Sequence, residues 1–358
     1  MILEKMMSDL FISLNLACCL QVILLGFIGG LLSGFIGSGG AFFMTPGMMN
    51  LGVQGVIAVA TNITHKFGKA MVGSKKHGEL GHVDKKLGIF MLITAVIGIR
   101  LAVWIASSLF KEGESNGAAA NLYISLVFVL SLLIVAVSIL LDLWKSSRAG
   151  STGPSRKITD FLSNLRLFPM IYFPVADVKI SLWILMIVGL ATGYLAGTIG
   201  VGGFIGVPAM IYVFGIPAAV AAGTELFLAM FMGAFGAISY ALEGFVDIRL
   251  VLLLYLGSLI GVYIGTYGTK VVKESIIRLV TGLIILLCVV SRIIAIPIYL
   301  NQLNLSDIAT PDQYDAFNQI SKYFLYLSGV SGCLVILFNV IRAYIKKRLV
   351  RATIVAKN

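Results

Sequence analysis

The sequence predicts an all-α polytopic membrane protein, built from two homologous multi-helix repeats with helices broken by glycine and proline, plus an extra C-terminal helix. Three observations support this prediction. Of the 358 residues, 59% are hydrophobic and 12% are charged, and so small a charged fraction cannot cover the surface of a soluble domain. The apolar residues form blocks long enough to cross a bilayer, which takes about 20 residues. The chain also matches itself at a fixed offset.

Seven apolar blocks are candidates for membrane spans, and in lipid their backbone polar groups can be satisfied only within helices. These blocks are Leu16–Ile36, Leu87–Phe110, Leu122–Leu141, Ile180–Ile199, Leu250–Thr266, Ile276–Ile296 and Tyr323–Ile341. With the more polar segments between them, they predict four spans in each half of the chain and a ninth near the C-terminus. We expect a multi-pass protein of the bacterial plasma (inner) membrane.

The chain contains an internal repeat. Shifting it by 163 residues aligns Gly26–Gly98 with Gly189–Gly261 without a gap, and 18 of the 73 pairs are identical, ten of them glycines. Such self-similarity predicts one helical plan for both halves. We expect a first transmembrane repeat over 1–144 and a second over 180–300. Residues 301–358 then form a loop, the C-terminal transmembrane helix and a basic tail.

Each repeat begins with a glycine-rich helix that ends in a break. The glycines at i, i+4 and i+8 favour close contact with another helix, and they are Gly26, Gly30 and Gly34, then Gly189, Gly193 and Gly197. The breaks consist of Gly37, Ser38, Gly39 and Gly40, then Gly200, Gly202 and Gly203. A helix broken at membrane depth exposes N–H groups that bind anions without a basic side chain. The two breaks therefore predict one anion site between them, with tight packing as the alternative.

Two polar pairs follow the breaks, Thr61-Asn62 and Thr224-Glu225. Threonine hydroxyls can donate hydrogen bonds to an oxyanion, although they also commonly bond to a carbonyl of their own helix. We expect Thr61, Asn62 and Thr224 to bind the substrate.

Glu225 stands in a largely apolar stretch, and a carboxylate inside a membrane marks a functional site by default. It is the candidate for ion coupling, with H⁺ or Na⁺ as the coupling ion. The alternative is a structural partner for Lys66, Lys69 or Arg100. His65, Lys66 and Lys69 could also draw an anion inward, or extend to the interface. Arg100 and Arg292 could pair with the substrate or with a helix carboxylate.

Basic residues are concentrated in three patches, Lys75–Lys86, Lys145–Lys179 and Arg342–Lys357, which hold 16 of the 27 Lys and Arg. Such patches are typical of cytoplasmic loops, where they contact anionic lipid. Residues 145–179 are the predicted basic cytoplasmic linker, and Ile158–Phe168 within it favours either an interfacial helix or a plain tether. The basic loops lie at different places in the two halves, which indicates an inverted repeat, whereas four spans per half would make the repeats parallel.

The glycine breaks, Thr61-Asn62 and the loop Gly81-His82-Val83-Asp84 resemble the TauE/SafE sulfite-exporter permeases. The stretch Ala60–Gly73 is similar to a subgroup of that family with an enlarged central loop. The resemblance covers about residues 20–297 in both halves. It implies transport of sulfite, sulfoacetate, taurine-related or other organosulfur anions, coupled to an ion gradient.

Enzyme motifs are missing from the sequence: it contains no H-E-x-x-H, no complete G-x-S-x-G around Ser38 and no nucleotide loop after a strand. We expect no enzyme activity, no cofactor and no metal. The expected partners are a small anion, a coupling ion and the lipid bilayer, and not nucleic acid. The prediction is a secondary-active anion transporter that works by alternating access; an uncoupled anion channel and a non-transporting membrane scaffold are the alternatives.

Overall fold

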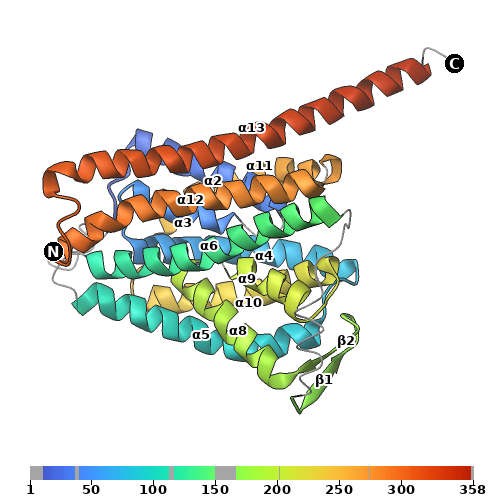
Figure 1. The fold of residues 1–358 in the computed structure, drawn as a ribbon, viewed down its shortest axis with the longest axis horizontal. Helices are drawn as coiled ribbons and strands as arrows, with labels where there is room; N and C mark the ends of the chain where they lie inside the picture. Colours follow the sequence, from blue (N-terminus) through green and yellow to red (C-terminus); the bar gives the residue numbers. More distant parts are fainter. Residues whose placement is uncertain are drawn as a thin grey trace.

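The computed structural model describes residues 11–36, 40–112, 117–149, 167–200, 202–272 and 274–355, and it shows a bundle of long helices (Figure 1). The helices before the central linker are α2 (Leu16–Ile36), α3 (Ala41–Asn50), α4 (Gly55–Glu79), α5 (Lys85–Glu112) and α6 (Ala118–Ala149). Those after it are α8 (Leu182–Ile199), α9 (Gly203–Pro208), the π-helix η1 (Ala209–Val213), α10 (Ala218–Leu242), α11 (Ile248–Val271), α12 (Glu274–Gln302), the 3-10 helix η2 (Pro311–Gln313) and α13 (Tyr314–Val355).

Within the described ranges, eight helices are long and apolar enough to cross a membrane: α2, α5, α6, α8, α10, α11, α12 and α13. Every predicted apolar block lies in one of them, except that Ile180 and Ser181 belong to a strand. Helix α4 is as long as α10, at 25 residues, but Lys66 and Lys69 make it more polar. The chain is a polytopic helical membrane protein, as its composition predicts.

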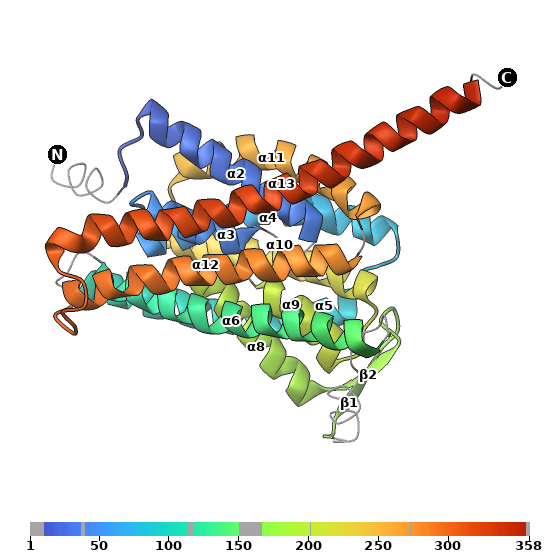
Figure 2. The same cartoon turned by 45° about the horizontal axis from the view of Figure 1, so that its top comes forward.

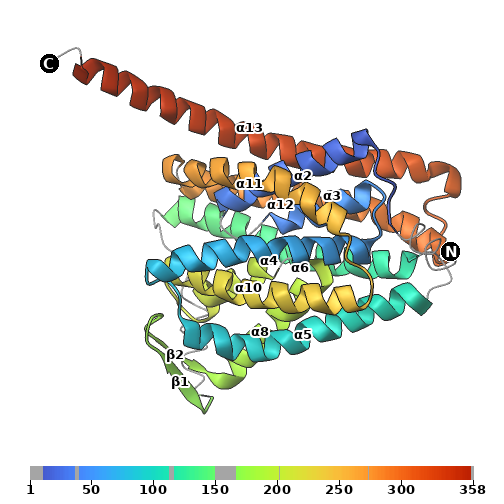
Figure 3. The same cartoon turned by 180° about the vertical axis from the view of Figure 1, so that it is seen from behind.

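The loops gather at two opposite ends of the bundle, which we call the outer end (the end with the loop before α4) and the inner end (the end with the start of α12). At the outer end, the side chain of Asn121 at the start of α6 donates to Gln54 Oε1 in the loop before α4, at 3.2 Å. At the inner end, Arg278 near the start of α12 donates to Asp142 near the end of α6, at 3.2 Å. Helices α6 and α12 lie side by side (Figure 2). Helix α4 runs from the outer to the inner end and α10 runs back, so these two neighbours are antiparallel (Figure 3).

The two ends carry opposite charge. Basic residues in and next to the described inner loops are Lys75, Lys76, Lys85, Lys86, Lys179 and Arg278. Acidic residues at the outer end are Glu243, Asp247, Asp307, Asp312 and Asp315. Because cytoplasmic loops are rich in Lys and Arg, we expect the inner end to face the cytoplasm.

The predicted glycine rows bring helices into backbone contact. A Cβ at Gly26 or Gly30 of α2 would meet the backbone of Leu254 or Ser258 in α11. In the same way, a Cβ at Gly193 of α8 would meet the backbone of Ala95 in α5. These contacts confirm the predicted role of the rows in close packing, since only glycine lets two helix backbones approach so closely.

A β-hairpin on the inner end departs from the all-α prediction. Strands β1 (Met170–Phe173) and β2 (Val178–Ser181) pair antiparallel, and Figure 1 shows them at the edge of the bundle. Asp84 Oδ2 accepts hydrogen bonds from the N–H groups of Val175 and Ala176, both at 3.1 Å, so the hairpin turn is fixed by a buried carboxylate. The hairpin includes the end of the predicted linker; the predicted interfacial helix over 158–168 lies almost wholly outside the described residues.

Candidate substrate site

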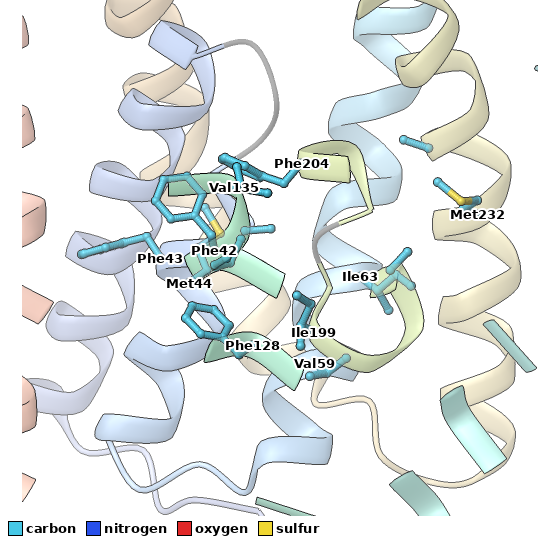
Figure 4. Packing of buried hydrophobic residues seen from close by; sticks show 14 of the residues in the cluster. Phe42, Phe43, Met44, Val59, Ile63, Phe128, Val135, Ile199, Phe204 and Met232 are labelled. Carbon is cyan, nitrogen blue, oxygen red and sulfur yellow. The ribbon is translucent and has the colours of Figure 1, made fainter. Parts of the chain in front are cut away.

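The chain reverses direction at both breaks. Helix α2 runs inward from the outer end and α3 returns to that end, whereas α8 starts at the inner end and α9 with η1 returns there (Figure 1). The two short helices meet in the middle of the bundle. The rings of Phe42 and Phe204 are 4.7 Å apart at 77°, and Figure 4 shows Val135 of α6 beside them. This edge-to-face pair closes the space between α3 and α9 with apolar side chains.

Asn62 links α4 to both breaks. Its amide Nδ2 donates to the carbonyl oxygen of Ala41 at 3.0 Å and to Thr45 Oγ1 at 2.7 Å. The Thr45 hydroxyl in turn donates to the carbonyl of Ile199, at the end of α8, at 3.0 Å. A Cβ at Gly200 would lie 2.9 Å from the same Asn62 amide nitrogen. One side chain of the first half thus contacts the break of the second half.

Glu225 packs against α9 on the other side of that break. A Cβ at Gly206 would meet Glu225 Oε2, and the Lys66 ammonium lies 4.0 Å from Glu225 Oε1. The Glu225 and Lys66 side chains are only 5% and 13% exposed. Lys66 is one of the three basic residues that the sequence offered as a partner for Glu225, and it is the one that lies beside it. Arg100 contacts a different carboxylate, Glu243, at 3.9 Å.

Several buried polar atoms around the second break have no hydrogen-bond partner among the described residues. They are the Thr192 hydroxyl, Asn62 Oδ1 and both carboxylate oxygens of Glu225. A buried polar group without a partner costs free energy, of order 1–3 kcal/mol each. Such a concentration in one place indicates a polar site that a ligand or water completes.

Thr224 has a role in the fold. Its hydroxyl accepts a hydrogen bond from the backbone N–H of Asp84 at 3.0 Å, next to the loop that holds the hairpin. The equivalent threonine, Thr61, is fully buried and makes no such bond within the described ranges. The structure thus separates two residues that the repeat made equivalent.

The predicted glycines fall into two groups. Gly37, Ser38 and Gly39 lie outside the described residues. Gly40 packs so closely on α2 that a Cβ would meet the carbonyl of Gly29, and Gly200 adopts the left-handed conformation at φ 77°. Gly202 and Gly203 are buried at the start of α9. Packing and backbone conformation therefore explain Gly40 and Gly200 without a ligand.

The remaining charged candidates lie apart from this site. The His65 ring contacts Tyr255, and its Nε2 lies 2.7 Å from Ser258 Oγ, both on α11. Arg292 is 1% exposed and donates to Asn50 and Ser321 near the outer end. In the part of the chain that the structure describes, no three His, Cys, Asp or Glu side chains gather in a way that could hold a metal ion.

Comparison with known proteins decides the family. Residues 22–292 match the family described as "Sulfite exporter TauE/SafE". The chain belongs to this family. Three proteins of Bacillus subtilis (strain 168), each named a probable membrane transporter protein, are also similar: YjnA is 29% identical over 248 residues, which are 69% of this chain and 89% of YjnA. YdhB is 25% identical (72% and 93%), and YunE is 22% identical (74% and 94%). No solved structure matches the chain at a significant level.

Two polar residues of this TauE/SafE protein escaped the sequence reasoning, Thr45 and Thr192. Identity between the two halves does not point to them, because each threonine is found in one half only. Pro208 stands at the position equivalent to Thr45, and Gly29 stands at the position equivalent to Thr192. A useful signal would have been a hydroxyl residue within a turn or two of a glycine break.

Proposed function

We propose that this TauE/SafE protein is a secondary-active transporter of a small anion, such as sulfite, a sulfonate or another organosulfur anion. The observation that carries the proposal is the position of Asn62. It bonds to the start of α3 and lies beside Gly200, so that it joins the two breaks in the membrane interior. Substrate sites of secondary transporters occur at such breaks near the bilayer midplane.

The two halves form an inverted repeat in this proposal. Helix α2 enters from the outer end and α3 returns to it, so this pair does not cross the membrane. Helices α4, α5 and α6 then cross the membrane three times. The second half consequently starts at the inner end, in the opposite orientation. The helix bounds support the repeat, because α4 and α10 begin at Gly55 and Ala218 and end at Glu79 and Leu242, an offset of 163 at both ends.

Alternating access would open the closed space between α3 and α9 first to one end and then to the other. The contact between Phe42 and Phe204 supports a carrier over an open channel, because it places apolar rings in contact between the two short helices. We assign substrate contact to Thr61, Asn62, Thr224 and the break residues on both sides, and ion coupling to Glu225.

Purified protein in proteoliposomes tests the proposal. Radiolabelled sulfite and ethanesulfonate should enter, uptake should saturate, and unlabelled anion inside should accelerate entry by exchange. Rates far above those of a carrier without exchange would indicate a channel, and the absence of any flux would refute transport of these anions.

Gly202→Val tests the site itself. A Cβ at Gly202 would lie 2.9 Å from the Cβ of Ala196 and 3.2 Å from the carbonyl of Thr192, so valine should displace α9 and reduce uptake by more than about tenfold, equivalent to 1.4 kcal/mol. Gly78→Val is the matched control, because a Cβ at Gly78 meets nothing within 4 Å. Equal uptake by both variants would contradict a site at the break.

A further inference from the structure

We propose that Lys66 is the cation that binds the substrate anion, and that Glu225 releases it for this purpose by taking up a proton. One proton then moves with each monovalent anion. This inference rests on the proposed transport function and names both the coupling ion and a binding residue outside the predicted site.

The contact between Lys66 and Glu225 is loose. The two charged groups are 4.0 Å apart, whereas a hydrogen-bonded pair of an ammonium and a carboxylate is about 2.7–2.9 Å long. Neither carboxylate oxygen has a hydrogen-bond partner in the described ranges. By contrast, Lys111 and Glu243 at the outer end form a pair at 2.7 Å. Lys66 is thus attracted to Glu225 without being fixed by it, so that another anion can replace the carboxylate.

Lys66 is placed to reach the break. It follows Asn62 by four residues, and side chains at i and i+4 lie on the same face of a helix. Asn62 contacts Gly200, before α9, and Glu225 contacts Gly206, within α9. An anion bound to Lys66 would therefore lie beside the first turn of α9.

The charge paired with Glu225 comes from α4. Other titratable residues lie beside its neighbours in α10: the Asp84 N–H bonds to Thr224, and a Cβ at Gly223 would meet His82 and His77. Lys69 is the further charged neighbour of Lys66, and His65 faces α11 through Ser258. On α5, Arg100 and Lys111 contact Glu243, and on α8 the ionisable group is Tyr194, which bonds to Tyr123. Helix α9 contains no ionisable residue.

Proton uptake keeps the charge of this cluster constant. The two lysines and an ionised Glu225 sum to one positive charge. Two lysines, a neutral Glu225 and a monovalent anion sum to the same value. Because moving buried charge through a membrane is costly, equal charge lets the empty and the loaded protein change conformation with similar ease. An anion beside an ionised Glu225 would instead place two negative charges around one ammonium, and these repel each other.

The repeat supports a ratio of one to one. The position equivalent to Lys66 in the second half is Ala229, and the position equivalent to Glu225 in the first half is Asn62. The site therefore contains one such cation from one half and one carboxylate from the other. A symmetric site would have offered two of each.

Proteoliposomes that contain a pH-sensitive dye measure the coupling. The probe is radiolabelled ethanesulfonate, since a sulfonate stays ionised at every pH used and cannot carry a proton itself. We expect uptake to acidify the interior. A gradient with acid outside should drive accumulation of about tenfold per pH unit, the limit for one proton per anion. A potassium potential set with valinomycin should leave the rate unchanged, because the cycle moves no net charge.

Variants separate the two roles. Glu225→Gln should keep exchange of ethanesulfonate but lose accumulation in a pH gradient. Lys66→Gln should lose both by more than tenfold, and Lys66→Arg should restore exchange, which shows that charge rather than folding is at fault. Lys111→Gln is the matched control, because it removes the lysine of another Lys–Glu pair.

Three results would decide against the inference. Uptake without acidification of the interior would overturn it and leave the proposed transport function standing, as would normal accumulation by Glu225→Gln or normal exchange by Lys66→Gln. If neither ethanesulfonate nor sulfite entered with the wild-type protein, the proposed function itself would fall, and the inference with it.

Discussion

The two short helices that meet at the centre of the bundle are built on one plan but held differently. Each has proline as its sixth residue, Pro46 in α3 and Pro208 at the end of α9. All ten residues of α3 are buried and form a regular α-helix. After Pro208 the second helix widens into the π-helix η1, of which Met210 alone is buried. A π-helical turn is rare and frequently lies at a functional site. Because fewer of its residues are buried, the second short helix is the less constrained of the two.

The tips of these helices are anchored by different chemistry. At the tip of α3, Asn50 accepts a hydrogen bond from Arg292 and another from Ser321, and all three are buried. At the tip of η1, Tyr212 donates to Asp142 at 3.5 Å, and Asp142 pairs with Arg278 in a partly exposed position. The outer tip is therefore the firmer one, and we expect the path to open more readily toward the cytoplasm.

The largest predicted effect tests this comparison at its firm end. Asn50→Leu keeps the branched shape and the number of heavy atoms of the side chain but leaves the buried Arg292 without its main acceptor. Removing one partner of a buried charged contact costs about 3–5 kcal/mol, and we expect a loss near the lower value because Ser321 still accepts from Arg292 at 3.2 Å. The midpoint of thermal unfolding in detergent, compared with that of the wild type, measures it.

Asp142→Asn is the matched change at the other tip. Asp142 and Arg278 are 20% and 26% exposed, and a partly exposed ion pair contributes about 0–1 kcal/mol.

At the outer tip, the double variant Asn50→Leu with Arg292→Met should recover much of the stability that Asn50→Leu loses, since it removes the buried charge as well. Equal destabilisation by the two single variants would refute the asymmetry between the tips.

The sequence predicted the architecture because membrane helices are specified by simple rules. Apolar length placed the spans, and glycine rows marked the helix pairs that approach most closely. The inner hairpin was not predicted, because its turn depends on Asp84, which is about ninety residues away in the chain and close only after folding. The direction of the repeat stayed open because a helix that enters and returns cannot be told from a crossing by composition alone.

A second prediction compares Asp84 with its repeat equivalent, Asp247, which has the same offset of 163. Asp84 accepts three backbone N–H bonds, from Leu87, Val175 and Ala176. Asp84→Ala should cost about 2–3 kcal/mol, because buried N–H groups then lose a charged acceptor. Tryptic cleavage at Lys179 in β2 should become faster, and the unfolding midpoint should fall.

Asp247→Ala should cost less, about 1 kcal/mol, because Asp247 bonds mainly to the Arg249 side chain, which is 53% exposed and can turn to water. It should leave cleavage at Lys179 unchanged. Faster cleavage in both variants would show that the hairpin depends on overall stability and not on Asp84.

The candidate site was predicted only in part, and the reason is again the difference between the halves. Identity between the repeats located the breaks and the polar pairs beside them, but Asn62 and Glu225 occupy equivalent positions with different chemistry. The partner of each comes from a unique residue, Thr45 for Asn62 and Lys66 for Glu225. A repeat reveals what two halves share, but it does not reveal contacts between residues that differ from one half to the other.

The smallest predicted effect concerns α4. Its backbone bonds to the side chain of Tyr255 in α11, and the residue at the equivalent position in the other half is not a tyrosine. The Tyr255 hydroxyl accepts from the N–H of Gly68 at 3.1 Å and donates to the carbonyl of Thr64 at 3.4 Å, the two groups that would bond to each other in an unbroken helix. A side chain inserted there bends a helix. The repeat equivalent of Tyr255 is Leu92 of α5, in the first half, and leucine has no hydroxyl to insert into α10.

Tyr255→Phe should therefore cost about 1 kcal/mol or less, the net contribution of a hydrogen bond, and a calorimetric scan should show a correspondingly small fall in the unfolding midpoint. Tyr263→Phe is the control on the same helix, since Tyr263 is 83% exposed and should show no change. A loss as large as that of Asn50→Leu would mean that the Tyr255 contact with α4 contributes as much to stability as the anchor of α3. The difference between the halves would then lie in the long helices as much as in the short ones.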